Sequence, residues 1–264
     1  MTEISQSGFL HALGWAVLNS LWQMALLWVI YQFISGLIIR KNISLKNSLA
    51  TFLLLAGFGW FVFTFFAILS DSTHKITLIE NTFSGFAGNE KLNNWFQLLL
   101  LAAAITYVLL LGIPLYRFWK SYRYLIIIRN EGLKKINVEW RIFSKKLSAI
   151  MGIRKTVSIW LSEYVTSPVT IGFLKPVILL PIAAMSNLTT RQLEALLLHE
   201  LSHIKRHDYL INLLINGIST ILYFNPFVKL FIRSIESDRE KSCDEMVIQF
   251  QCDPHGYATA LLQL

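Results

Sequence analysis

The segment LLLHELSHIKRHD, residues 196–208, places two histidines and a glutamate at a spacing that suits metal chemistry. His199 and His203 are four residues apart, so on an α-helix both imidazoles project from the same face. Glu200 directly follows the first histidine, where its carboxylate can reach a metal-bound water molecule. Two histidine ligands with an adjacent glutamate as general base are typical of zinc peptidases. The pattern therefore predicts a catalytic site with Zn²⁺ as cofactor; the alternative is a surface helix with incidental histidines.

A zinc site of this kind needs a third protein ligand, and the segment IESDREKSCDEM, residues 235–246, offers three acidic candidates. Glu236, Glu240 and Asp244 are spaced by four residues and share one helical face. A ligand carboxylate followed one turn later by a second carboxylate fits a ligand and an outer group that orients a histidine. The alternative interpretation is a solvated acidic face that pairs with neighbouring basic residues.

Two polar residues at the end of the histidine segment are not expected to bind the metal. His207 lies one turn after His203, but a catalytic site with three protein ligands must keep one position open for water. We expect His207 to form a hydrogen bond or to lie at an interface. Asp208 is nine residues after His199, about half a turn away around a helix, so we expect no direct contact with the metal.

Other polar side chains near the motif are expected to have supporting roles. Arg206 should pair with Glu236 or with a neighbouring acid, and Cys243 should pack in the interior. His255 and Tyr257 are candidates for stabilising the oxyanion, because peptide hydrolysis needs an electrophilic donor beside the scissile carbonyl.

Three apolar blocks precede these motifs. The 264 residues are 54% hydrophobic and 15% charged, whereas soluble domains carry about 25% charged residues. The apolar residues concentrate at about residues 9–39, 49–69 and 95–119, and a membrane-spanning helix needs about 20 residues. We therefore expect a membrane domain of three spans at residues 1–118, followed by a zinc metallopeptidase domain at residues 119–264.

The charges of the connecting segments predict how the spans are oriented. The first connection contains Arg40, Lys41 and Lys46 without an acid, whereas the second, residues 71–94, has a net charge of −1. Residues 117–155 contain eleven basic residues against two acidic ones. Because basic loops remain on the cytoplasmic side, we expect a multi-pass protein of the inner (cytoplasmic) membrane. Its N-terminus should lie outside, and its active site should lie on the cytoplasmic side.

The segment SPVTIGFLKPVILLP, residues 167–181, predicts a β-hairpin shortly before the histidine helix. Two β-rich stretches flank GFLKP. A proline before each stretch favours the edge of a sheet, because proline cannot donate a hydrogen bond to a neighbouring strand. A protein substrate can add a strand to such an edge. Val169, Thr170 and Gly172 are therefore candidate substrate-binding residues.

An apolar stretch at residues 209–232 separates the histidines from the acidic candidates and constrains the path of the chain. If it crossed the membrane once, the histidines and Glu240 would lie on opposite sides of a hydrocarbon core about 30 Å thick. Asn225-Pro226 is a turn signal through which a regular helix does not continue. The arms before and after it contain 17 and 15 residues. An antiparallel helical hairpin would therefore return Glu240 to the histidines.

Together, HELSHIKRHDYLIN, YFNP and REKSCDE resemble the integral-membrane zinc peptidases of the BlaR/MecR type, a family of antibiotic-sensing signal transducers. The hairpin segment resembles the strand region before their metal helix. The resemblance implies a gluzincin domain, which would make the chain a mainly α-helical membrane protein with a small β-sheet. By motif position it also implies zinc ligands at His199, His203 and Glu240, a catalytic acid/base at Glu200 and an outer carboxylate at Asp244.

The predicted function is a membrane-embedded zinc endopeptidase, an HExxH gluzincin acting in transmembrane signalling. Its expected partners are the lipid bilayer and a cytoplasmic or membrane-proximal protein substrate, either a transcriptional repressor or the chain itself, with no direct nucleic acid contact. We also consider a homodimer. Two alternatives stay open: a non-proteolytic transducer or scaffold stapled by zinc, and a housekeeping protease for membrane-protein quality control. Because YATALLQL stops within a helical pattern, we expect the chain to continue beyond residue 264.

Overall fold

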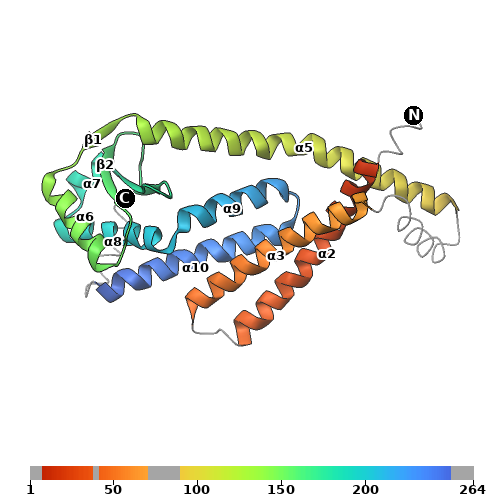
Figure 1. Cartoon of the computed structure of the whole chain (residues 1–264), viewed down its shortest axis with the longest axis horizontal. Coiled ribbons are helices and arrows are strands. Elements are labelled where there is room, and N and C mark those ends of the chain that lie inside the picture. Colours follow the sequence, from red (N-terminus) through yellow and green to blue (C-terminus); the bar gives the residue numbers. More distant parts are fainter. Residues whose placement is uncertain (1–7, 38–41, 71–89, 251–264) are drawn as a thin grey trace. The chain divides into compact units, whose positions relative to one another are not determined.

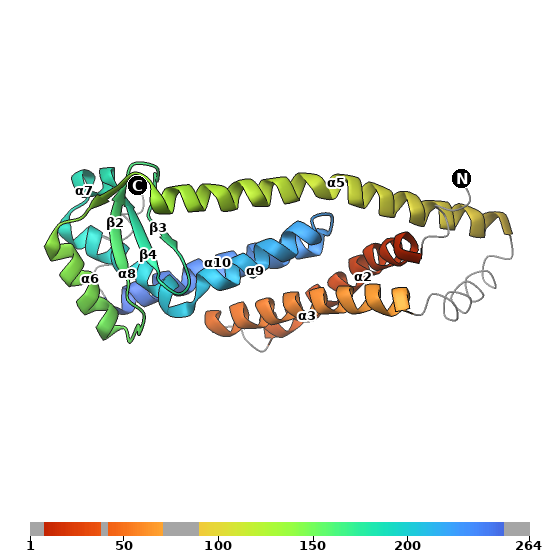
Figure 2. The same ribbon diagram turned by 45° about the horizontal axis from the view of Figure 1, so that its top comes forward.

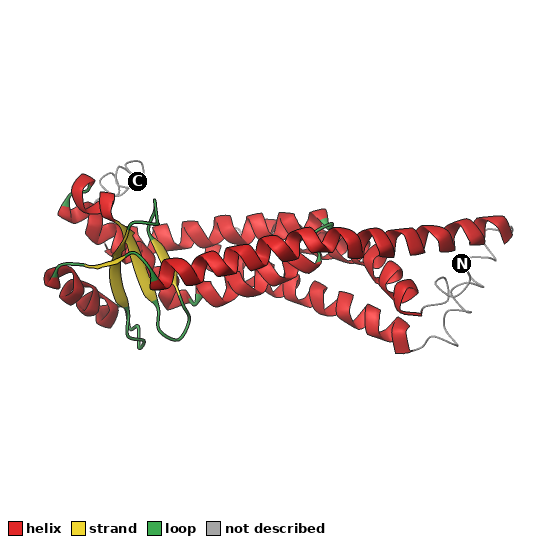
Figure 3. Ribbon diagram, turned by 90° about the horizontal axis from the view of Figure 1, so that it is seen from above, coloured by secondary structure: helices red, strands yellow, loops and turns green. Residues whose placement is uncertain are grey.

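The fold is mainly α-helical with one small β-sheet, as the sequence predicts (Figure 3). The structure is a computed structural model that describes residues 8–37, 42–70 and 90–250. Its helices and strands carry the labels of Figure 1. The chain divides into two compact units, and each is described by itself.

The first unit, here called the helical unit, consists of Met1–Tyr116 and Ile218–Asp238. It contains α2 (Gly8–Leu37), α3 (Ile43–Ser70) and the first part of α5 (Glu90–Asn130). All three helices are long and apolar enough to cross a membrane, with mean hydropathies of 1.5, 2.3 and 2.5 in their most apolar windows. The three predicted spans are confirmed as helices of sufficient length and hydropathy, and the chain is a membrane protein. The predicted domain boundary after residue 118 stays a prediction.

Contacts between α2 and α3 combine aromatic packing with a polar bond. The rings of Trp22 and Trp60 meet edge to face at 5.5 Å between centroids, and Gln23 Nε2 donates a hydrogen bond to Thr64 Oγ1 at 3.1 Å. Such bonds commonly join apolar helices inside membranes. Large apolar side chains of these helices remain exposed, as expected for surfaces in contact with lipid.

The third apolar helix extends further than predicted. α5 continues past residue 119 and ends only at Asn130. Its last turns carry several basic residues but contain no glycine or proline that would interrupt the helix. Gly132, with a φ of 65°, then occupies the left-handed conformation that ends the helical path.

A turn at Asn225 joins α9 (Asp208–Ile221) to α10 (Pro226–Phe250), where the sequence predicts the reversal of the chain. The Asn225 side chain is buried. Its oxygen accepts two backbone hydrogen bonds from the first turn of α10, at 3.0 and 3.4 Å. Its amide donates to the carbonyl of Ser20 in α2 at 2.9 Å. Pro226 is the first helical residue, a position at which its missing N–H has no helical partner to lose.

The tip of this hairpin packs on the apolar helices within the helical unit. Tyr107 of α5 stacks on Tyr223 at 5.7 Å between ring centroids, and its hydroxyl donates to the carbonyl of Ile221 at 3.1 Å. Phe231 of α10 meets Trp28 of α2 at 5.0 Å. With 14 residues, α9 is about 21 Å long, which is shorter than a hydrocarbon core of about 30 Å. Because α9 is too short to cross this core, the chain reverses direction at the turn at Asn225 and continues as α10, as predicted.

The second unit, here called the sheet unit, consists of Arg117–Gly217 and Arg239–Leu264. Its four strands lie in the order β1-β2-β4-β3. Their bounds are β1 (Leu133–Lys135), β2 (Ser158–Ser162), β3 (Val169–Ile171) and β4 (Val177–Pro181). The neighbouring strands β2 and β4 are parallel, whereas the other two pairs are antiparallel.

The predicted hairpin is present, but only one of its strands lies at the edge. β3 is an edge strand, whereas β4 pairs with β3 on one side and β2 on the other. The edge position expected for the second stretch is therefore wrong. Pro176 precedes β4 and Pro181 is its last residue, so the middle of the strand keeps all of its N–H donors. A proline beside a strand does not exclude an interior position.

Buried apolar clusters lie on both faces of β4 within this unit, whose strands and helices are drawn in Figure 2. The sheet unit contains α6 (Val138–Ile150), α7 (Ile182–Asn187) and α8 (Thr190–Arg206), together with parts of α5, α9 and α10. Ile178 and Leu180 of β4 belong to the same buried cluster as the leucines of α8. Leu179, on the opposite face of the strand, packs with Ile128 from the end of α5. This burial fixes α8 beside the sheet, with contacts to the edge strand β3.

Candidate metal centre

The helix α8 carries the histidine motif, and local sequence defines both of its ends. Thr189 forms a capping box with Gln192: the Thr189 hydroxyl accepts the Gln192 backbone N–H, and the Gln192 side chain accepts the Thr189 backbone N–H. At the other end, His207 adopts the left-handed conformation with a φ of 61°, and its N–H donates to the carbonyl of Ile204 at 3.2 Å. His199 and His203, the two histidine candidates for metal ligands, thus lie on a helix with well-defined ends.

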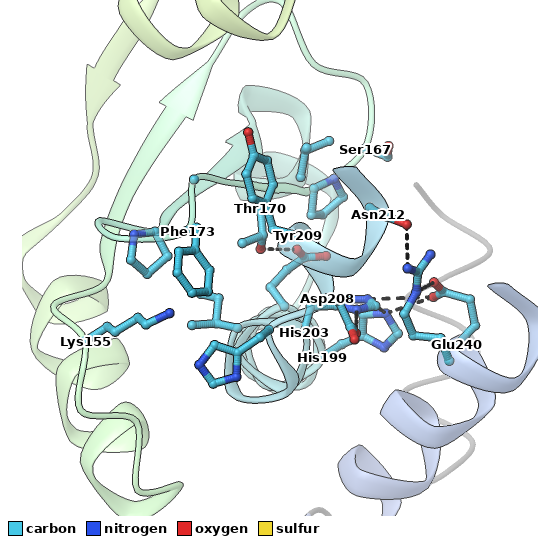
Figure 4. A pocket seen from close by; sticks show the side chains of 18 of the residues that line it. Lys155, Ser167, Thr170, Phe173, His199, His203, Asp208, Tyr209, Asn212 and Glu240 are labelled. Atoms are coloured by element: carbon cyan, nitrogen blue, oxygen red, sulfur yellow. Dashed lines mark hydrogen bonds and ion pairs between the residues drawn. The ribbon is translucent and has the colours of Figure 1, made fainter. Parts of the chain in front are cut away.

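Side chains of His199, His203 and Glu240 converge, as Figure 4 shows. The two Nε2 atoms are 3.1 Å apart, and Glu240 Oε2 lies 3.5 Å from His199 Nε2 and 3.8 Å from His203 Nε2. In a tetrahedral zinc site with bonds of about 2.0–2.1 Å, ligand atoms are separated by about 3.3 Å. The three atoms therefore have spacings that fit a zinc ion. Of the three acidic candidates, Glu240 is the one that reaches this point.

Each histidine has a carboxylate at its other ring nitrogen. Asp244 Oδ1 lies 3.2 Å from His199 Nδ1, and Asp208 Oδ2 lies 2.8 Å from His203 Nδ1. A carboxylate that accepts the Nδ1–H leaves the Nε2 lone pair for a metal and holds the ring in place. Asp244 thus lies where an outer carboxylate was predicted, whereas Asp208 was assigned no such role.

Sequence reasoning missed Asp208 because it extended the geometry of α8 through a helix break. The left-handed turn at His207 ends α8, and Asp208 begins α9. The turn brings the carboxylate back to His203 and leaves the Asp208 residue only 3% exposed. The available signal was a charged residue at the start of a strongly apolar helix, a position that usually requires a partner.

Glu200, the predicted catalytic acid/base, is held by the edge strand. Thr170 Oγ1 donates a hydrogen bond to Glu200 Oε2 at 2.6 Å (Figure 4). All three predicted edge residues, Val169, Thr170 and Gly172, line a cavity of about 500 Å³ that also contains the convergent histidines. Gly172 has a φ of 93°, and a Cβ atom there would lie 2.9 Å from the carbonyl of Lys175. Only glycine suits this turn.

Two buried or partly buried arginines lie beside the acidic groups of the centre. Arg239 Nη1 donates to Asn212 Oδ1 at 2.5 Å, and its Nε lies 3.9 Å from Glu240 Oε1. Arg206 donates to the hydroxyl of Ser242, and its Nε lies 3.6 Å from Asp208 Oδ1. The acid near Arg206 is therefore Asp208, which is one of the neighbouring acids allowed by the prediction.

Of the four remaining predicted side chains, two lie beside the centre and two fall outside the described residues. Cys243 is fully buried, with its sulfur 3.4 Å from His203 Nδ1. His207 lies against Phe173 at 5.7 Å between ring centroids and is not among the convergent ligand atoms. His255 and Tyr257 lie outside the described residues, so their assignment to the oxyanion stays a prediction.

Protons compete with a metal at this centre. Burial acts to lower the pKa of His203, but its hydrogen bonds with Asp208 and Cys243 prevail and raise the pKa to about 10. The hydrogen bond with His199 and nearby positive charge lower the pKa of Glu240, although burial opposes this. A metal ion that binds here must therefore displace a proton from a histidine, while the acidic ligand is already ionised.

The sequence is similar to a known protein family and to several of its members. The profile of a family described as BlaR1 peptidase M56 matches residues 65–264. The chain is 27% identical over 191 residues to the methicillin resistance mecR1 protein of Staphylococcus aureus strain Mu50. The aligned region is 69% of this chain and 32% of that protein.

Regulatory proteins named BlaR1 are also similar. The one from Staphylococcus aureus is 28% identical over 151 residues, which is 55% of this chain and 25% of that protein. The one from Bacillus licheniformis is 35% identical over 88 residues, which is 33% of this chain and 14% of that protein. The chain thus spans about a third or less of the length of these relatives.

Proposed function

Because the chain belongs to the BlaR1 peptidase M56 family, we propose that it is a membrane-embedded zinc endopeptidase. The observation that carries this proposal is the convergence of His199 Nε2, His203 Nε2 and Glu240 Oε2 at ligand spacing, within 3.1–3.8 Å of one another. Glu200 follows His199 in sequence and lines the same cavity, but its carboxylate is not one of the three convergent ligand groups. Three ligands with a separate carboxylate suit a catalytic centre.

The proposed mechanism assigns a separate task to each side chain. His199, His203 and Glu240 would hold the zinc ion, which when bound polarises the scissile carbonyl and acidifies water. Glu200 accepts a proton from the attacking water and passes it to the nitrogen of the leaving amine. Thr170 keeps the Glu200 carboxylate in one orientation through its 2.6 Å hydrogen bond.

The edge strand supports a mode of substrate binding. β3 has β4 on one side only, and its residues line the cavity that contains Glu200. An extended segment of a protein substrate would pair with the backbone of β3 and thereby present a peptide bond to the metal centre. This arrangement favours an unfolded or flexible segment over a folded surface.

The biological setting is proposed from charge and from the relatives. The relatives are named as methicillin resistance and regulatory proteins, which supports a role in signalling across the membrane. We propose a cytoplasmic or membrane-proximal protein substrate, either a repressor-like target or the chain itself. The basic residues of 117–155 favour a cytoplasmic active site with the N-terminus outside.

A purely structural zinc site has less support. A closed site needs a fourth protein ligand, for which His207 and Asp244 are the sequence candidates. Asp244 approaches His199 at Nδ1, whereas the convergent atom of that ring is Nε2. His207 lies against Phe173 instead. Neither residue joins the convergent group.

The test compares two glutamates of α8 in the purified full chain. Glu200→Gln should abolish cleavage of casein, an unstructured general substrate, while the protein retains one zinc ion per chain by elemental analysis. The control Glu194→Gln, on the same helix but outside the cavity lining, should cleave as the unmodified protein does. Cleavage at the unmodified rate by Glu200→Gln would exclude Glu200 as the acid/base. Full zinc retention without cleavage by the unmodified protein would favour the structural site.

A further inference from the structure

A second cavity, of about 820 Å³, lies in the sheet unit between α6 and the strands β1 and β2. Its volume is within the range of small-molecule sites. Of the described residues that line it, only Lys155 also lines the cavity at the metal centre. Apolar side chains contribute to its wall, among them the buried Ile136 and Ile159. This cavity has no part in the mechanism proposed above.

Positive charge surrounds the second cavity. Among the residues that the structure describes, five basic ones line it and no acidic one does. They are Lys135, Arg141, Lys145, Arg154 and Lys155. Within residues 8–37, 42–70 and 90–250, none of the five forms an ion pair, although Lys155 lies over the ring of Phe173 at 3.7 Å. Unpaired cations around one cavity favour an anionic ligand.

Buried hydroxyl groups add hydrogen-bonding capacity to the wall. Ser144 and Ser148 lie one turn apart on α6 and line the cavity. They are 2% and 6% exposed, and neither Oγ atom has a hydrogen-bond partner. Buried hydroxyls normally have partners, so this wall could bond to an oxygen-rich ligand after small side-chain rotations.

The rim of the cavity is apolar as well as basic. Val138 and Ile142, also one turn apart on α6, line the cavity and are 65% and 63% exposed. Exposed aliphatic side chains next to lysine and arginine are typical of surfaces that bind amphiphilic anions. A simple inorganic anion would leave these side chains in water.

We propose that this cavity binds a phosphate-bearing amphiphile, with the phosphate among the five basic side chains and the apolar part on Val138 and Ile142. The phosphate offers several strong acceptor oxygens that suit lysine and arginine donors. Two sources share this chemistry: an anionic phospholipid of the surrounding membrane, and a soluble phosphorylated compound. The site is independent of the proposed peptidase activity.

The test uses two adjacent lysines of α6 as reporter and control. Lys145 lines the cavity, whereas Lys146 is exposed and does not line it. The full chain is reconstituted in nanodiscs of phosphatidylcholine alone or with phosphatidylglycerol. A second set of phosphatidylcholine discs receives glycerol 3-phosphate or ATP. Each sample is treated briefly with an amine-reactive reagent, and the labelling of each lysine is measured by mass spectrometry.

Selective protection of Lys145 relative to Lys146 supports the proposal. Protection by phosphatidylglycerol assigns the ligand to the membrane, and protection by a soluble phosphate assigns it to solution. Arg141→Gln should weaken the protecting interaction about fivefold, since one basic residue contributes about that factor near an anionic surface, while thermal unfolding shows that the variant remains folded. Equal protection of both lysines would indicate only general surface attraction, and no protection in any sample would mean no site. Either result overturns the proposal.

Discussion

Replacement of Thr170 by valine tests whether its hydroxyl positions Glu200, the proposed general base. Both side chains are β-branched and favour a strand, so Thr170→Val removes the hydroxyl with little change in shape. The lost interaction is the 2.6 Å hydrogen bond to Glu200 Oε2. None of the convergent ligand atoms belongs to Thr170, so zinc binding should be unchanged.

The size of the effect follows from the type of bond. A hydrogen bond to a charged group contributes about 1.5–3 kcal/mol. If the bond orients Glu200 in the transition state, its loss should lower kcat about 10- to 150-fold, since about 1.4 kcal/mol corresponds to tenfold. KM should change little, because the hydroxyl contacts Glu200, whereas the substrate peptide is proposed to pair with the backbone of β3.

The assay measures kcat and KM for a quenched-fluorescent peptide that the unmodified protein cleaves. Zinc content is determined on the same samples. Thr170→Ser should restore most of kcat because it returns the donor. If the valine variant kept full kcat with zinc bound, the hydrogen bond would have no role in catalysis. A loss that serine does not restore would indicate a packing effect of the methyl group.

Three further outcomes follow from the contacts of the described residues. Asp208→Asn should weaken zinc binding about 10- to 100-fold, because it removes the carboxylate that holds His203; competition with a chromogenic chelator measures this, and unchanged affinity would contradict the assigned role. Asn225→Ala should lower the free energy of unfolding by about 2–4 kcal/mol, since it leaves buried backbone groups without partners, as denaturant titration would report; a change below about 0.5 kcal/mol would contradict it. Removal of zinc with a chelator should abolish casein cleavage, and stoichiometric zinc should restore it; activity that persists in metal-free protein would refute the metal-dependent mechanism.

The sequence alone determined the features that depend on local spacing. His199 and His203 lie one helical turn apart, and three apolar blocks are long enough to span a membrane. The turn at Asn225-Pro226 is also local. The helical arms before and after it are nearly equal in length, so Glu240 returns to the end of the hairpin where the histidines lie. Helical periodicity and rise are properties of the backbone, so these features could be worked out without knowledge of the packing.

Only the tertiary structure decided the features that depend on contacts between distant segments. The hydrogen bond from Thr170 to Glu200 joins residues 30 positions apart, and it exists because buried leucines fix α8 against the sheet. The interior position of β4 depends on its pairing with β2, which no residue of the hairpin indicates. The role of Asp208 depends on the left-handed turn at His207, an uncommon conformation for a residue other than glycine. Residue types and spacing suggested the candidate metal ligands, whereas the groups that contact and orient those side chains became visible only in the folded chain.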